Sequence, residues 1–239
     1  MKALTGQGSY WSTSKSHRYS LLFAMPLLML YELLEAVAPV RTQGGVIRNG
    51  ADVILTGLFS WLLGPRGPLV FMTIVILVAA WLIRRDNSSG PLRVSTFAAM
   101  LGESIALATV FGFVVGTVTM RLLTMAAPAT GDSQLARLTL SLGAGLYEEL
   151  LFRVVLVALL ANAFRLIGFG KLFGGTLATV LGALIFSAFH YMGSLGEPFQ
   201  VQSFVFRAIA GLAFSALYLT RGFGITAWTH AIYDIFVLL

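Results

Sequence analysis

The stretch Gly145-Leu-Tyr-Glu-Glu-Leu-Leu-Phe-Arg153 places two adjacent carboxylates and an arginine inside an otherwise apolar segment. A charge near the centre of a lipid bilayer costs at least about 2.5 to 3.5 kcal/mol, so such groups usually have a function and need partners. Residues four apart share one helix face, which predicts an ion pair between Glu149 and Arg153. Glu148 points about 100° away from Glu149 and is the candidate general base. The alternative is a buried charge cluster that only fixes helix packing.

The composition indicates a membrane protein. Hydrophobic residues make up 57% of the chain and charged residues 11%, against roughly 25% charged in a typical soluble domain. The net charge of +6 comes from scattered lysines and arginines. This pattern is typical of loops that set membrane orientation and does not indicate a nucleic-acid partner. The chain has no cysteine, which excludes disulfides and thiolate metal ligands.

Long apolar runs alternate with short polar loops, which predicts an all-α fold, a polytopic transmembrane helical bundle forming one integral-membrane domain over residues 1–239. A polar leader over residues 1–18 is expected to be solvated. A span needs about 20 apolar residues, and the run at 51–63 is shorter, so it is re-entrant, tilted or extended. Seven or eight spans result. The clear runs are 19–38, 69–83, 94–125, 135–164, 172–191 and 201–220, with a last helix after Gly224.

Three carboxylates lie in or beside the predicted N-terminal spans. Glu32 and Glu35 are three residues apart near the end of the first run, where solvation at the membrane interface is the favoured interpretation. Glu103 lies within the run at 94–125 and is interpreted as a polar packing group, with support of a distant site as the alternative.

Two of the three histidines, His190 and His230, lie in predicted spans. Taken singly, each would be a hydrogen-bonding group between packed helices. A glutamate such as Glu148 beside a histidine can instead remove a proton from water. His230 and Asp234 share a helix face and can approach a substrate carbonyl from the other side. Phe186 precedes His190 by four residues and is expected to line the site.

Three motifs occur in order on separate predicted helices. They are Glu-Glu-x-x-x-Arg at 148–153, Phe-x-x-x-His at 186–190 and His-x-x-x-Asp at 230–234. This ordered set resembles the motifs of the CPBP family of intramembrane glutamic proteases, which includes the type II CAAX prenyl endopeptidases and the bacterial Abi proteins. The resemblance covers roughly the last 100 residues, so the catalytic core is expected within 135–239.

The resemblance implies a role for each motif residue. Glu148 with His190 would activate the water, Glu149 and Arg153 would support the site, and His230 with residue 234 would stabilise the oxyanion. The family commonly has asparagine where this chain has Asp234, and an ionised carboxylate would repel an oxyanion. Asp234 is therefore either protonated or, as we predict, orients His230.

The predicted helix limits place the two histidines at different depths. His190 lies at the end of its run, whereas His230 is about six residues, roughly 9 Å, from the start of the last helix. The helices must be tilted or offset for both groups to reach one site.

The resemblance implies an intramembrane endopeptidase that hydrolyses a peptide bond of a membrane-associated or lipidated protein. It implies no cofactor and no metal, and a multi-pass protein of a bacterial or archaeal cell membrane. The expected partners are the lipid bilayer and a protein or peptide substrate. One alternative is a zinc protease that uses His190, His230 and a carboxylate, although the chain has no His-Glu-x-x-His helix. Others are a non-catalytic scaffold or bacteriocin-immunity protein, and a proton-coupled transporter.

Overall fold

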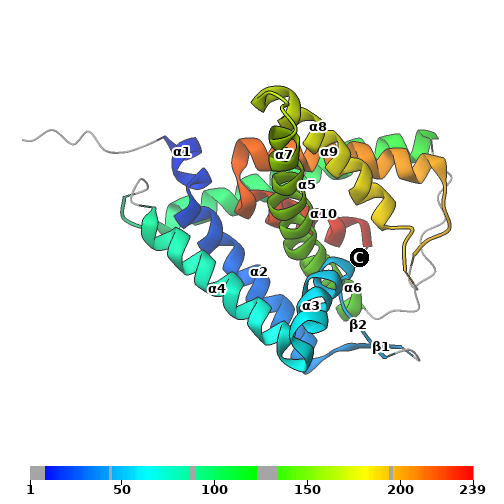
Figure 1. The fold of residues 1–239 in the computed structure, drawn as a ribbon, viewed down its shortest axis with the longest axis horizontal. Helices are drawn as coiled ribbons and strands as arrows, with labels where there is room; N and C mark the ends of the chain where they lie inside the picture. The colour runs from blue at the N-terminus through cyan, green and yellow to red at the C-terminus, as the bar shows by residue number, and fades with distance from the viewer. Residues whose placement is uncertain (1–8, 43–44, 87–89, 123–133, 194–195, 239) are drawn as a thin grey trace, which may run out of the picture.

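The computed structural model describes residues 9–42, 45–86, 90–122, 134–193 and 196–238, which form a helical bundle with one small hairpin (Figure 1). The helices are α1 Tyr10–Lys15, α2 His17–Val37, α3 Gly50–Leu63, α4 Gly67–Arg85, α5 Val94–Leu122, α6 Gln134–Gly143, α7 Val157–Leu166, α8 Lys171–Phe189, α9 Val201–Arg221 and α10 Phe223–Leu238. The strands β1 Val40–Thr42 and β2 Gly45–Ile47 pair antiparallel, η1 Gly64–Arg66 is a 3₁₀ turn, and η2 Ala144–Leu156 is π-helical.

Five stretches of the described chain are long and apolar enough to cross a membrane. They are His17–Val37, Gly50–Arg85, Val94–Val114, Lys171–Phe189 and Val201–Arg221. Large apolar side chains are exposed along them, such as Trp61, Leu69 and Phe113. An exposed apolar surface of this extent suits contact with lipid. The protein is therefore a multi-pass membrane protein.

The short run predicted at 51–63 forms α3, and the chain then reverses so that α4 packs back against α3. A Cβ atom added to Gly67 would lie 2.3 Å from the carbonyl carbon of Phe59. Residues eight apart on one straight helix would be about 12 Å apart, so the chain reverses at η1. Gly64 begins this turn with a φ of 66°, and the rings of Phe59 and Phe71 pack with centroids 5.3 Å apart. Stretch Gly50–Arg85 is thus a helical hairpin.

The predicted helix over 135–164 is divided into three segments. Helices α6 and α7 flank η2. In this π-helical segment the backbone N–H of residue i+5 donates a hydrogen bond to the carbonyl of residue i. The apolar pattern predicted a helix but did not distinguish this wider form. Segment η2 packs closely on α10, since a Cβ atom on Gly145 would lie 2.5 Å from the carbonyl oxygen of Ala227. Only glycine allows this approach.

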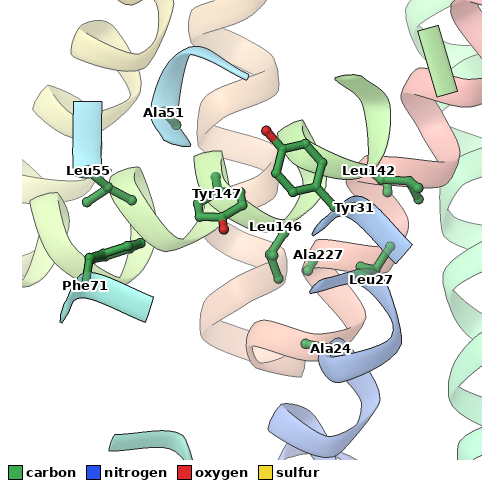
Figure 2. Packing of buried hydrophobic residues seen from close by; sticks show 11 residues of the cluster. Ala24, Leu27, Tyr31, Ala51, Leu55, Phe71, Leu142, Leu146, Tyr147 and Ala227 are labelled. Carbon is green, nitrogen blue, oxygen red and sulfur yellow. The ribbon is translucent and has the colours of Figure 1, made fainter. Parts of the chain in front are cut away.

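A hydrophobic core holds η2 against the N-terminal helices (Figure 2). The rings of Tyr31 and Tyr147 meet edge to face with centroids 5.2 Å apart. The buried members come from α2, α3, α4, α6, η2 and α10. They are Ala24, Leu27, Tyr31, Ala51, Leu55, Phe71, Leu142, Leu146, Tyr147, Ala227 and Ala231. The core therefore joins the first helices to the segment that carries the paired glutamates.

The prediction that Glu32 and Glu35 are solvated at the membrane interface is wrong for Glu35, whereas 33% of the Glu32 side chain stays exposed. Glu35 is 7% exposed, and neither of its carboxylate oxygens has a hydrogen-bond partner among the described residues. Glu32 accepts hydrogen bonds from the Tyr147 hydroxyl at 2.6 Å and from Arg48 at 3.1 Å. The hairpin β1–β2 returns Arg48 to α2, which the local sequence pattern did not reveal.

The predicted packing role of Glu103 is confirmed. Its carboxylate accepts hydrogen bonds from Arg221 of α9 at 2.5 and 2.7 Å and from the Tyr10 hydroxyl of α1 at 2.6 Å. Residues 1–8 of the predicted leader lie outside the described residues. The part over Tyr10–Lys15 is helical and packs on α5 and α9, so it is not simply solvated.

Candidate active site

Three charged or titratable side chains meet in the interior of the bundle. Glu149 is fully buried, and Arg153 and His230 are 3% and 4% exposed. Oxygen Oε1 of Glu149 lies 3.1 Å from a guanidinium nitrogen of Arg153 and 2.7 Å from Nδ1 of His230. A carboxylate only accepts hydrogen bonds, so Nδ1 carries the hydrogen. The predicted ion pair is confirmed, and the same carboxylate orients the imidazole.

Two phenylalanines enclose this cluster. The Arg153 guanidinium lies 4.5 Å from the ring centroid of Phe186 and 5.7 Å from that of Phe214. The His230 ring stacks on Phe214, with centroids 4.5 Å apart and planes 19° apart. Apolar walls exclude water and strengthen the electrostatic contacts inside. Sequence reasoning missed Phe214 of α9, because nothing distinguishes it among the 18 phenylalanines of the chain.

Glu148 lies on a different face of η2 and has a different partner. Its Oε1 accepts a hydrogen bond from Nδ2 of Asn49 at 3.0 Å, and both side chains are buried. Among the described residues, no other donor reaches this carboxylate. Sequence reasoning missed Asn49, which precedes Glu148 by 99 residues. The local sequence indicates only that asparagine suits the start of α3.

His190 lies at the C-terminal end of α8, next to the same aromatic wall. Its Nδ1 is 2.9 Å from the carbonyl oxygen of Phe186. A carbonyl only accepts, so Nδ1 carries the hydrogen, and in the neutral imidazole Nε2 keeps its lone pair. The Phe186 ring centroid is 5.0 Å from that of His190 and 6.4 Å from that of His230, so the two histidines flank one phenylalanine. Their predicted difference in depth does not keep them apart.

Glu148 and His190 do not form a direct hydrogen bond in the described structure. The charge of Glu148 acts on the His190 ring electrostatically. Each side chain has its own partner instead, the Asn49 amide for Glu148 and the Phe186 carbonyl for His190.

Asp234 lies one turn after His230 on α10. Its Oδ2 is 3.7 Å from Nε2 of His230, which is too long for a hydrogen bond. The hydrogen bond that orients the ring is the one from Nδ1 to Glu149. The imidazole is therefore flanked by a carboxylate on each side, and the orienting role of Asp234 stays a prediction.

No group of three histidine, aspartate or glutamate side chains in the described part of the chain is arranged to hold a metal ion. The zinc alternative required such a set from His190, His230 and a carboxylate. Its direct test is peptide cleavage in the presence of EDTA.

The apolar helices and the buried Glu–Arg–His cluster define a multi-pass membrane protein with acid–base groups inside a helical bundle. Residues 132–236 match the family model described as Type II CAAX prenyl endopeptidase Rce1-like, and this part of the chain is a domain of that family. Membership of the family suggests an intramembrane protease. Comparison with curated proteins and with solved structures gave no match. The matched range includes every predicted site residue and excludes Asn49.

Proposed function

We propose that the protein is an intramembrane endopeptidase in which Glu148 is the general base that activates water. The observation that carries this proposal is the contrast between two adjacent carboxylates. Glu149 is occupied by Arg153 and His230, whereas Glu148 accepts one hydrogen bond from the Asn49 amide. A base must accept a proton during the reaction, and a carboxylate paired with a guanidinium is poorly suited to do so.

In the proposed reaction, a water held between Glu148 and Nε2 of His190 loses a proton to Glu148 while its oxygen bonds to the substrate carbonyl carbon. The carbonyl π electrons move to the oxygen, and Nε2–H of a protonated His230 donates to the resulting oxyanion. The carbon–nitrogen bond then breaks as Glu148 returns the proton to the leaving nitrogen, which yields a carboxylic acid and an amine. General base catalysis contributes about 10²–10⁴-fold, and one oxyanion donor about 10²–10³-fold.

The remaining site residues support His230 in this proposal. Glu149 holds the Nδ1–H, which directs Nε2 away from Glu149 and toward the side where Asp234 lies. The nearby Asp234 carboxylate favours the protonated imidazole. Arg153 neutralises Glu149, and Phe186 separates the two histidines and lines the substrate position.

We further propose that one domain over residues 1–239 crosses the membrane seven or eight times. The continuous helical stretch 134–166 and α10 supply crossings beyond the five apolar stretches. The family description names a CAAX prenyl endopeptidase, which supports a membrane-associated or lipidated protein as the substrate. The proposed location is a bacterial or archaeal cell membrane, and the proposed chemistry uses no metal.

The test compares membrane and secreted peptides from cells that carry the wild-type protein with those from cells that carry Glu148→Gln at the same protein level. Asp86→Asn is the control, because this carboxylate follows α4 and accepts a hydrogen bond from the Arg18 nitrogen at the start of α2, away from the site. A cleavage product that disappears only with Glu148→Gln is expected, and it would also identify the substrate. If the peptides stay unchanged while Glu148→Gln abolishes a cellular effect, the scaffold or immunity function is the better one.

A further inference from the structure

We propose that Asn49 is a positioning residue for Glu148, so that the N-terminal part of the chain completes the active site of the C-terminal domain. This inference rests on the proposed role of Glu148 as the base. Asn49 lies between β2 and α3, outside the matched range 132–236. Its Nδ2 donates to Oε1 of Glu148 at 3.0 Å.

The orientation of the Asn49 amide is determined at both ends. Its Oδ1 accepts a hydrogen bond from the backbone nitrogen of Ala51 at 2.9 Å, which caps α3. A backbone N–H only donates, so the atom facing Ala51 must be the oxygen. The other end then presents the NH₂ group to Glu148, a carboxylate that only accepts. The side chain is therefore locked with its donor directed at the proposed base.

A buried polar network holds the Asn49 backbone. The Asn49 nitrogen donates to the Tyr31 hydroxyl at 3.2 Å, and that hydroxyl donates to Asp52 at 2.8 Å. Arg48 pairs with Asp52 through Nε and with Glu32 through a second nitrogen at 3.1 Å. Tyr31 and Asp52 are completely buried. The network thus fixes Asn49 to α2 and α3 at once.

The same network contacts the segment that carries Glu148. The Tyr147 hydroxyl donates to Glu32 at 2.6 Å, so the residue before Glu148 is tied to α2. A Cβ atom on Gly143 would lie 2.5 Å from the Tyr31 ring and 2.9 Å from Cβ of Asn49. This close approach places Asn49 against the start of η2. Glu148 is therefore held through its side chain and through its neighbours in the chain.

The hydrogen bond leaves one carboxylate oxygen for the reaction. With Oε1 occupied by Asn49, Oε2 of Glu148 accepts no hydrogen bond from the described residues and is directed to the water in the proposed reaction. Misplacing a reacting group by about 1 Å can lower a rate about 10²-fold. Asn49 does not touch the substrate in this scheme. Its loss should therefore lower kcat and leave KM nearly unchanged.

The test uses the full-length protein in lipid vesicles and the cleaved peptide identified by the proteomic comparison. Asn49→Ser and Asn49→Asp keep an oxygen that caps α3 and remove the NH₂ donor. Asn49→Ser should lower kcat about 10- to 100-fold at constant KM. Asn49→Asp should lower it further, because a second carboxylate then faces Glu148. In a Glu148→Gln background, Asn49→Ser should cause no additional loss.

Two controls separate positioning from folding. The Ser16 hydroxyl caps α2 by accepting a hydrogen bond from the Tyr19 nitrogen, at a place remote from the site. Ser16→Ala removes this cap. It should lower the melting temperature and leave the kcat of the folded protein unchanged. Asn162→Ser makes the same chemical change on the exposed surface of α7. It should change neither kcat nor the melting temperature.

The outcomes for Glu148 and Asn49 are distinguishable. Wild-type kcat in folded Asn49→Ser, while Glu148→Gln is inactive, would overturn this inference and leave the proposed function intact. If the measured kcat falls only in proportion to the amount of folded Asn49→Ser protein, the inference is overturned as well. Full cleavage by Glu148→Gln would overturn the proposed function, and the inference with it.

Discussion

Glu148 and Glu149 are neighbours in the sequence and lie in two different environments. The Glu149 side of η2 meets Arg153, His230 and the ring of Phe214, all from η2, α9 and α10. The Glu148 side meets Asn49, which begins α3. Glu149 is paired with a guanidinium and an imidazole through its Oε1, whereas Glu148 has a single amide donor. Identical side chains thus receive different chemical roles from the elements that pack against each face.

The contrast is strongest for Glu148→Gln. Glutamine keeps the shape of the side chain and an oxygen that accepts from Asn49, so the melting temperature should change little. It cannot accept the proton of a water, and the cleavage rate should fall about 10²–10⁴-fold. The measurement is the initial rate of peptide cleavage in vesicles beside thermal unfolding of the same sample. A rate within tenfold of wild type would contradict the role of Glu148.

Glu149→Gln should act mainly on stability. It leaves the Arg153 charge buried without a carboxylate partner, which should lower the free energy of unfolding by about 3–5 kcal/mol. Denaturant unfolding in detergent measures the change. The double variant Glu149→Gln/Arg153→Met removes both charges and should recover part of the loss. Equal stability of Glu149→Gln and wild type would show that the two carboxylates do not differ as described.

Gly145→Ala tests the close packing that brings the two environments together. The added methyl group would lie 2.5 Å from the Ala227 carbonyl oxygen and should displace α10, at a cost of about 1–3 kcal/mol. Cleavage should fall too, because His230 lies on α10. Gly175→Ala is the matched control, since a Cβ atom there meets nothing within 4 Å. Equal melting temperatures for both variants would contradict the packing argument.

Phe214→Leu should give the smallest effect. Leucine fills much of the space and loses the stacking on His230, which is worth about 0.5–1.5 kcal/mol. The free energy of unfolding and kcat should both decrease modestly. Phe113→Leu is the control on the exposed surface of α5 and should change neither. If both variants behave alike, the ring of Phe214 does not hold the histidine.

Local sequence signals predicted the part of the site that lies within one turn of helix. Glu149 and Arg153 are four residues apart, so their ion pair follows from helical geometry alone. Glu148, His190 and His230 were selected because ionisable groups are costly in apolar segments. The roles of these residues in catalysis remain predictions. The solvation predicted for Glu35 failed because tertiary packing buries its carboxylate, and residue spacing along α2 does not encode which side of the helix is covered.

The apolar runs were enough to predict a multi-pass helical membrane protein, since such runs have few other stable environments. The sequence also indicated which ionisable groups were candidates for chemistry. The partner of each glutamate became known from the folded chain, because Asn49, Phe214 and His230 come from elements distant in the sequence. Helix periodicity specifies the face on which a side chain lies. Packing between helices specifies what that face contacts.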